Sequence, residues 1–191
     1  MSNALIALHF QNDICHPDGS IPFALDRGGE AAQRFLAASG TMLTRARQAG
    51  WTIAHVHIAF APDYSDLPRN CRLFNAVEKL GAVKRGSRGA MAMAGFEPGG
   101  DELSLIHACN NAFQGTGLDS QLRQRAVTHL CVMGLATQFS VEHSVRHAAD
   151  LGYFVTVARD CCASADVEAQ QASFRTMAML ADVCGSDEID F

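Results

Sequence analysis

A serine behind a glycine turn is the residue in this sequence most clearly placed for chemistry. Ser140 follows an apolar run at 130–133 and a break at Gly134, and apolar residues recur behind it at helical spacing. A strand, a tight turn and a helix are therefore predicted, with Ser140 in the first helical turn. Unpaired backbone N–H groups and the positive end of the helix dipole gather at such a place and stabilise a developing oxyanion. The stretch 128–151 is interpreted as the active-site turn of an α/β enzyme, or the remains of one.

Three histidines stand at or near the ends of other apolar runs, and they are candidates for the base that Ser140 needs. The pKa of a serine hydroxyl is too high for the alkoxide to form at neutral pH. The hydroxyl must therefore pass its proton to a base during the attack. A neutral imidazole suits this role at neutral pH, and His9 or His107 is expected to supply it. The other histidine, if protonated, would provide electrostatic support. Asp13 is the nearest carboxylate in sequence that could orient an imidazole.

The pattern of apolar residues predicts the elements that position these side chains. Strands are expected at 4–10, 51–59, 102–107, 130–133 and 153–158, and helices at 30–49, 73–80, 119–125, behind Ser140 and at 166–183. Strands that alternate with helices predict a three-layer α/β/α fold with a central parallel sheet, here as one domain over 1–191. Ligands bind such sheets outside the carboxyl ends of the strands. The irregular stretch 60–100 is expected to form a lid, a pocket wall or a subunit contact.

Composition and charge exclude several classes of protein. The chain has 191 residues, of which 48% are apolar, and this balance is typical of a globular domain with a sizeable core. Its net charge of −5, without a basic patch, argues against nucleic acid or anionic membranes as partners. No apolar run approaches the roughly 18 residues of a membrane span. The seven cysteines form no CxxC pair, which favours reduced thiols in a cytoplasmic protein.

Four motifs in a fixed order resemble the isochorismatase-like hydrolases, also called the cysteine hydrolase superfamily. They are LHFQND, IHACNNAFQGTGLD, MGLATQFSVEHSVRHAADLGY and ARDCCAS, and the resemblance covers nearly the whole chain. It implies the family's α/β fold, dimers or tetramers, and a centre of Asp, Lys and Cys in which the cysteine attacks an amide or similar carbon. The corresponding positions here hold His9, His107 and Ser140. The turn Leu135, Ala136 and Thr137 resembles the family's oxyanion turn, which contains a cis peptide.

Three functions are compatible with these replacements. The first is hydrolysis of a small amide, carbamoyl or ester substrate by Ser140, with His9 and His107 as base and electrostatic support and with no cofactor. The second is a catalytically inactive homologue that keeps the pocket for ligand binding or regulation. The third is a metal-dependent hydrolase in which His9, His57 and His107 form a three-histidine site.

The pocket for the small-molecule ligand is expected near the same strand ends. Its predicted lining is Gln11, Phe10, His57, Phe60, Tyr64 and Phe113. Core packing explains most of the aromatic residues in this set equally well.

Overall fold

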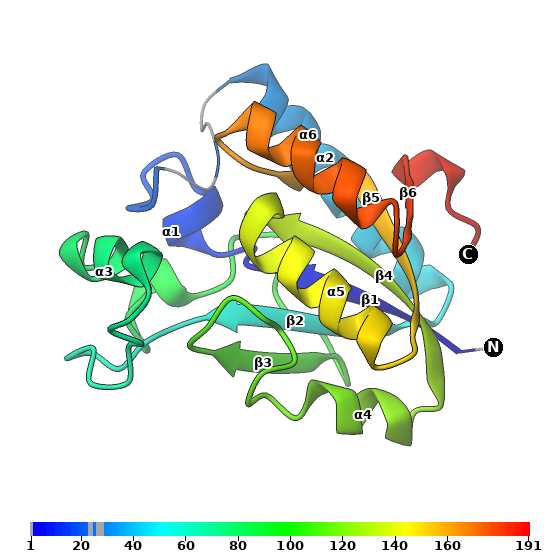
Figure 1. Cartoon of the computed structure of the whole chain (residues 1–191), viewed down its shortest axis with the longest axis horizontal. Helices are drawn as coiled ribbons and strands as arrows, with labels where there is room; N and C mark the ends of the chain where they lie inside the picture. The colour runs from blue at the N-terminus through cyan, green and yellow to red at the C-terminus, as the bar shows by residue number, and fades with distance from the viewer. Residues whose placement is uncertain (1, 23–24, 26–28) are drawn as a thin grey trace.

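A computed structural model describes residues 2–22, 25 and 29–191 (Figure 1). Its sheet has six strands in the order β3-β2-β1-β4-β5-β6, and every neighbouring pair is parallel. The strands are β1 (Ser2–Leu8), β2 (Thr52–Ile58), β3 (Leu103–His107), β4 (Val127–Leu135), β5 (Phe154–Ala163) and β6 (Asp182–Cys184). The predicted parallel sheet is confirmed.

Helices cover both faces of this sheet. They are α1 (Asn12–Cys15), α2 (Glu30–Gln48), α3 (Arg72–Lys79), α4 (Leu118–Gln124), α5 (Glu142–Asp150) and α6 (Val167–Met177). One hydrophobic cluster joins α2 and α3 to one face, and a second joins α4, α5 and α6 to the other. Figure 1 shows α5 in front of the sheet. The three-layer α/β/α architecture is therefore confirmed.

Strand β1 shows why the central runs are apolar throughout. Leu5 and Ala7 belong to the cluster on the α2 face, whereas Ile6 and Leu8 belong to the cluster on the α5 face. Successive side chains of a strand point to opposite faces, so a strand covered on both sides has no polar alternation. None of the helices in the described ranges is long and apolar enough to cross a membrane.

The C-terminal region differs from the sequence prediction. Helix α6 ends at Met177, and residues 182–184 form strand β6 instead of continuing the predicted helix to 183. Val183 pairs with Val157 of β5, so the edge of the sheet takes up its backbone groups. Strand β5 also continues to Ala163, beyond the predicted end at 158. The helix begins as expected, because the Asp166 carboxylate accepts a hydrogen bond from the N–H of Ala169 at 2.9 Å.

The turn between β4 and α5 depends on close contact with the end of β1. Gly134 has φ 135°, and a Cβ atom there would lie 2.2 Å from the carbonyl oxygen of Leu8. Only glycine allows this approach. The peptide bond between the following two residues, Leu135 and Ala136, is cis, as the family resemblance implied. A π-helical turn at Thr137–Val141 then leads into α5, so Ser140 lies immediately before the α-helix.

Candidate active site

The structure brings His9 and His107 into direct contact. His9 follows β1 in a left-handed conformation with φ 62°, and His107 is the last residue of β3. Because β2 lies between these strands, the two side chains meet across its carboxyl end. Their Nε2 atoms are 2.7 Å apart, and each residue is 4% exposed. The two predicted histidines therefore form a buried pair.

The outer ring nitrogens of the pair face backbone groups. His9 also hydrogen-bonds the backbone of Leu135, and this bond favours the protonated ring, as donation to a carbonyl does. With Nε2 of His9 facing His107, Nδ1 is the nitrogen left for this bond. When both rings are neutral, one of the two Nε2 atoms donates to the other across the contact of 2.7 Å. His107 Nδ1 lies 3.2 Å from the carbonyl oxygen of Asn111, and this contact likewise favours a proton on that nitrogen.

Burial keeps the histidines of this region neutral. Desolvation and repulsion from His107 and His57 lower the pKa of His9 well below its ordinary value. Burial also lowers the pKa of His107 to about 4, and burial with repulsion from His55 and His107 lowers that of His57 to about 4. Unprotonated imidazoles at neutral pH are able to accept a proton from a nucleophile.

Ser140 and His9 line the same narrow cavity. Its volume is about 40 Å³, and Ser140 is 4% exposed. Within the described part of the chain, the Ser140 hydroxyl has no hydrogen-bond partner, so it is bonded to neither histidine. The site therefore places the serine in the same cavity as His9, without a hydrogen bond that joins the two side chains.

The turn before α5 offers only some of its N–H groups to a ligand. The carbonyl oxygen of Ala136 accepts hydrogen bonds from the N–H groups of Phe139, Ser140 and Val141. The N–H groups of Thr137 and Gln138 do not donate to that carbonyl, and they are the remaining candidates for an oxyanion site in this turn. Thr137 Oγ1 and Gln138 Oε1 are also buried, without partners among the described residues.

Gln11, one of the predicted pocket residues, instead holds the backbone together. Its side-chain N–H groups donate to the carbonyl oxygens of Ile58 and Ala90 at 2.9 and 2.8 Å. Its side-chain oxygen accepts from the N–H of Ile58 at 2.8 Å. Gln11 is 0% exposed and does not line the cavity of Ser140.

The predicted aromatic residues and His57 do not line that cavity either. Phe10 stacks on Phe35 and Phe96, Phe60 packs against Phe74, the Tyr64 hydroxyl donates to Ala82, and Phe113 stacks on His147. These aromatic residues therefore take part in core packing, the alternative to a pocket lining that the sequence analysis left open. His57 is buried, and its Nε2 has no partner in the described ranges.

Apolar residues that the sequence analysis did not select form most of the cavity wall. They are Ile14, Ile21, Ile58, Leu73, Phe74, Val77, Val83 and Phe139, joined by Asn110 and by Ala136 of the predicted oxyanion turn. Three of them lie on α3, whose apolar face is directed inward. An amphipathic pattern identifies such a face as buried, but it does not distinguish a cavity wall from core packing.

Asp13 does not orient an imidazole, and that prediction was wrong. Its carboxylate accepts from the N–H of Val83 at 2.7 Å and from the N–H of Ser20 at 3.3 Å. It therefore fixes the surrounding loops. The backbone groups of Leu135 and Asn111 take the orienting place beside the histidines.

The three-histidine metal site was also a wrong prediction. Among the described residues, no group of three His, Cys, Asp or Glu side chains has an arrangement that could hold a metal ion. His9 and His107 direct their Nε2 atoms at each other at hydrogen-bonding distance, so neither Nε2 lone pair faces a common third point.

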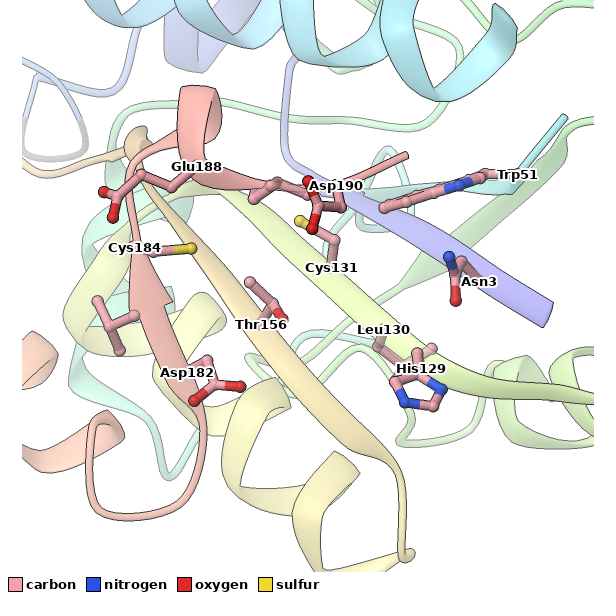
Figure 2. A pocket seen from close by; sticks show the side chains of 12 residues that line it. Asn3, Trp51, His129, Leu130, Cys131, Thr156, Asp182, Cys184, Glu188 and Asp190 are labelled. Atoms are coloured by element: carbon pink, nitrogen blue, oxygen red, sulfur yellow. The ribbon is translucent and has the colours of Figure 1, made fainter. Parts of the chain in front are cut away.

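Larger hollows lie outside the cavity of Ser140. One of about 350 Å³ borders His107. Another, of about 480 Å³, lies at the amino ends of the strands and contains none of the predicted catalytic residues. Figure 2 shows Asp182 and Glu188 on one side of it, with Trp51 and His129 opposite.

The fold and the turn define this chain as a three-layer α/β protein, with its candidate centre at the carboxyl ends of β1, β3 and β4. Residues 3–188 match the model of the isochorismatase domain. The chain belongs to the isochorismatase family of hydrolases.

Several relatives match this chain over most of its length. It is 25% identical over 181 residues to the isochorismatase family protein YecD of Escherichia coli O157:H7, covering 87% of this chain and 82% of that protein. It is 26% identical over 180 residues to the ureidoacrylate amidohydrolase RutB of Caulobacter segnis, covering 87% of this chain and 74% of that protein. The crystal structure of an isochorismatase family protein from Desulfovibrio vulgaris superposes with a TM-score of 0.86 at 27% identity, covering 97% and 95% of the two chains.

Proposed function

We propose that this protein hydrolyses a small amide, carbamoyl or ester substrate, with Ser140 as nucleophile and the His9–His107 pair as proton acceptor. The observation that carries the proposal is the shared cavity of Ser140 and His9 beside the Gly134 turn. The similarity to an amidohydrolase favours this substrate class. The neutral state of both imidazoles suits the role given to them.

The proton path requires one rearrangement of His9. In the tautomer that can accept the proton, His9 Nε2 donates to His107 Nε2 and His9 Nδ1 carries the lone pair, so Nδ1 must turn from the Leu135 backbone to the Ser140 hydroxyl before attack. Ser140 Oγ then bonds the substrate carbonyl carbon while its proton passes to His9, and the positive charge is shared with His107. The leaving amine or alcohol takes the proton, and water releases the acyl group in a second step. The N–H groups of Thr137 and Gln138 would stabilise the oxyanion.

The size of the cavity sets a second requirement. A water molecule occupies roughly 10–15 Å³ of cavity volume. The cavity of Ser140, at about 40 Å³, therefore holds only a few water molecules. A substrate therefore enters only when the wall opens. Leu73, Phe74 and Val77 place α3 in that wall, so α3 is the element expected to move.

The missing hydrogen bond between Ser140 and the histidines favours a second candidate, a homologue that binds a ligand without catalysis. The two candidates differ in whether the serine is activated. A fluorophosphonate that reacts with activated serines, followed by peptide-resolved mass spectrometry, separates them.

Hydrolysis predicts an adduct on the peptide that contains Ser140, absent in Ser140→Ala and strongly reduced in His9→Gln. A labelled serine hydrolase provides the positive control. If Ser140 stays unmodified beside that control, catalysis by this serine is refuted and ligand binding without catalysis remains. If an adduct forms but survives in His9→Gln, the serine is active and the role given to His9 is wrong.

A further inference from the structure

The cavity of Ser140 offers a ligand very few polar side chains. Its lining is aliphatic and aromatic except for His9, Asn110 and Ser140. None of these three carries a charge at neutral pH, since burial holds the pKa of His9 well below its ordinary value. Among the described residues, the cavity wall therefore contains no charged partner for a ligand.

A charged ligand would lose its hydration on entering this cavity and gain no ionic partner there. Transfer of an unpaired carboxylate or ammonium ion out of water is strongly unfavourable. The carboxylate of Asp13 accepts from the N–H groups of Val83 and Ser20 and does not line the cavity. Its negative charge beside Val83 opposes an anion, and its place outside the wall denies a cation a direct contact.

Asn110 is the polar residue of the wall that the proposed reaction does not use. It follows β3 by three residues and is partly exposed. In the described part of the chain, no hydrogen bond joins its side chain to another residue. The next residue differs, because the side chain of Asn111 contacts His147 Nδ1 at 2.7 Å and accepts from the N–H of Phe113 at 3.0 Å. The amide of Asn110 is therefore the one available to a ligand.

We propose that the ligand of this cavity is an uncharged primary amide or carbamoyl compound with a small apolar chain, and that Asn110 selects it over an ester. An asparagine side chain has N–H donors and a carbonyl acceptor, which complement the carbonyl and N–H groups of such a compound. An ester has no N–H group to donate. This inference rests on the proposed function in taking the cavity of Ser140 as the substrate site, but it does not require a reactive Ser140.

Four compounds with the same number of non-hydrogen atoms separate charge from shape. The neutral reference is 3-methylbutanamide. Malonamate has a carboxylate in place of its isopropyl group, and malonamamidine has an amidinium there. The ketone 4-methylpentan-2-one has a methyl group in place of the amide nitrogen. Each is titrated at pH 7 into the full chain with Ser140→Ala, which cannot hydrolyse the amide by the proposed route, and binding is followed by nitrogen–proton correlation NMR.

The neutral amide is expected to shift the backbone signals of cavity residues, such as Val77 and Phe139, in a saturable titration. Malonamate and malonamamidine should each bind ~100-fold more weakly, because neither ion finds a partner. The ketone should bind ~10-fold more weakly than the amide, because it cannot donate to Asn110. A further Asn110→Leu substitution should remove this preference for the amide.

A charge added to the wall tests the same argument in the opposite direction. Leu73 is partly exposed on α3 and lines the cavity, so an arginine at this position can reach a ligand from the surface. Leu73→Arg should bind malonamate ~10-fold more tightly than the parent protein does. Ala76→Arg adds the same charge to α3 outside the lining and should leave the binding of malonamate unchanged.

Several results would overturn the inference. The ligand is not restricted to uncharged compounds if malonamate or malonamamidine binds the cavity as tightly as 3-methylbutanamide, or if that amide gives no saturable shift there. Asn110 does not select the amide if the ketone binds equally well, or if a folded Asn110→Leu protein keeps the preference. Fluorophosphonate labelling reports on Ser140 alone, so an unlabelled serine in a selective cavity refutes only the hydrolysis, and a labelled serine in a cavity that accepts ions refutes only this inference.

Discussion

Single side chains in this protein divide into those that face the cavity and those that hold the backbone around it. His9 and Ser140 belong to the first group. Gln11 and Asp13 belong to the second, although both lie within a motif that resembles a catalytic one. Polar residues near a strand end are therefore not equivalent, because buried backbone groups also require hydrogen-bond partners.

The structural role of Gln11 predicts a large loss of stability in Gln11→Leu. The substitution leaves the N–H and carbonyl of Ile58 and the carbonyl of Ala90 without this partner. The expected loss is ~3 kcal/mol of unfolding free energy, since each buried unpaired group costs on the order of 1 kcal/mol or more. Urea denaturation measures the loss, and Gln33→Leu on the exposed face of α2 is the control. Equal stability of the two variants would refute the role.

Among the elements, the junction of β1, β4 and α5 decides the geometry of the site. Gly134 lets the end of β4 approach Leu8, and the chain then turns through the cis peptide toward Ser140. The same approach brings Leu135 beside His9, one residue beyond Leu8. One close backbone contact therefore sets the position of both candidate catalytic residues.

Two glycine substitutions distinguish the energetic cost of losing this close contact from the cost of a positive φ angle alone. Gly134→Ala places a Cβ atom 2.2 Å from the Leu8 carbonyl oxygen, whereas Gly152→Ala, at φ 84°, meets nothing within 4 Å. Gly152→Ala is expected to cost about 1 kcal/mol, from positive φ alone. Gly134→Ala should cost at least ~3 kcal/mol, because backbone must move. Thermal and urea unfolding compare them, and similar losses would show that the contact is unimportant.

For the molecule as a whole, the order of strands in the sheet concentrates imidazoles in a dry interior. His9, His57 and His107 come from three neighbouring strands and are all buried. Such an arrangement disfavours their charged forms, and it makes the stability of the whole domain depend on pH.

The direction of this dependence follows from the lowered pKa values. In the folded protein the pKa of His107 is about 4, whereas in the unfolded chain it returns to about 6.5. Between these two pH values the unfolded chain therefore binds a proton at His107 that the folded protein does not bind. Unfolding is therefore favoured as pH falls below 6.5, by up to about 3 kcal/mol from this residue. Burial opposes the ionisation of Glu102, but its bond to Arg47 outweighs this effect and helps to lower the pKa to about 2. The stability that ionised Glu102 contributes is therefore lost only below pH 4.5.

Urea denaturation between pH 4.5 and 7.5 isolates the histidine effect. The unfolding free energy of the wild-type protein should rise with pH up to about 6.5 and then level off. The slope should be smaller in His107→Gln. An unchanged slope in that variant would show that His107 is not the group responsible, and a stability that falls with rising pH would contradict the assigned direction.

Local pattern was sufficient to determine the class of fold and the edge of the sheet where the candidate site lies. Runs such as 4–10 and 130–133 are buried on both faces, and alternation with amphipathic helices makes the sheet parallel. The carboxyl ends of parallel strands share one edge, so His9, His107 and Ser140 were predicted at one end of the molecule. These inferences depend on spacing along the chain, which the sequence contains.

The tertiary structure alone decided which atoms meet. The bond between His9 and His107 spans 98 positions in sequence, and the anchoring of Gln11 to Ile58 spans 47. Strand order and the approach at Gly134 set these contacts, and neither is encoded in residues adjacent along the chain. The same holds for the cavities that border the histidine pair, because a volume exists only between elements that have already packed.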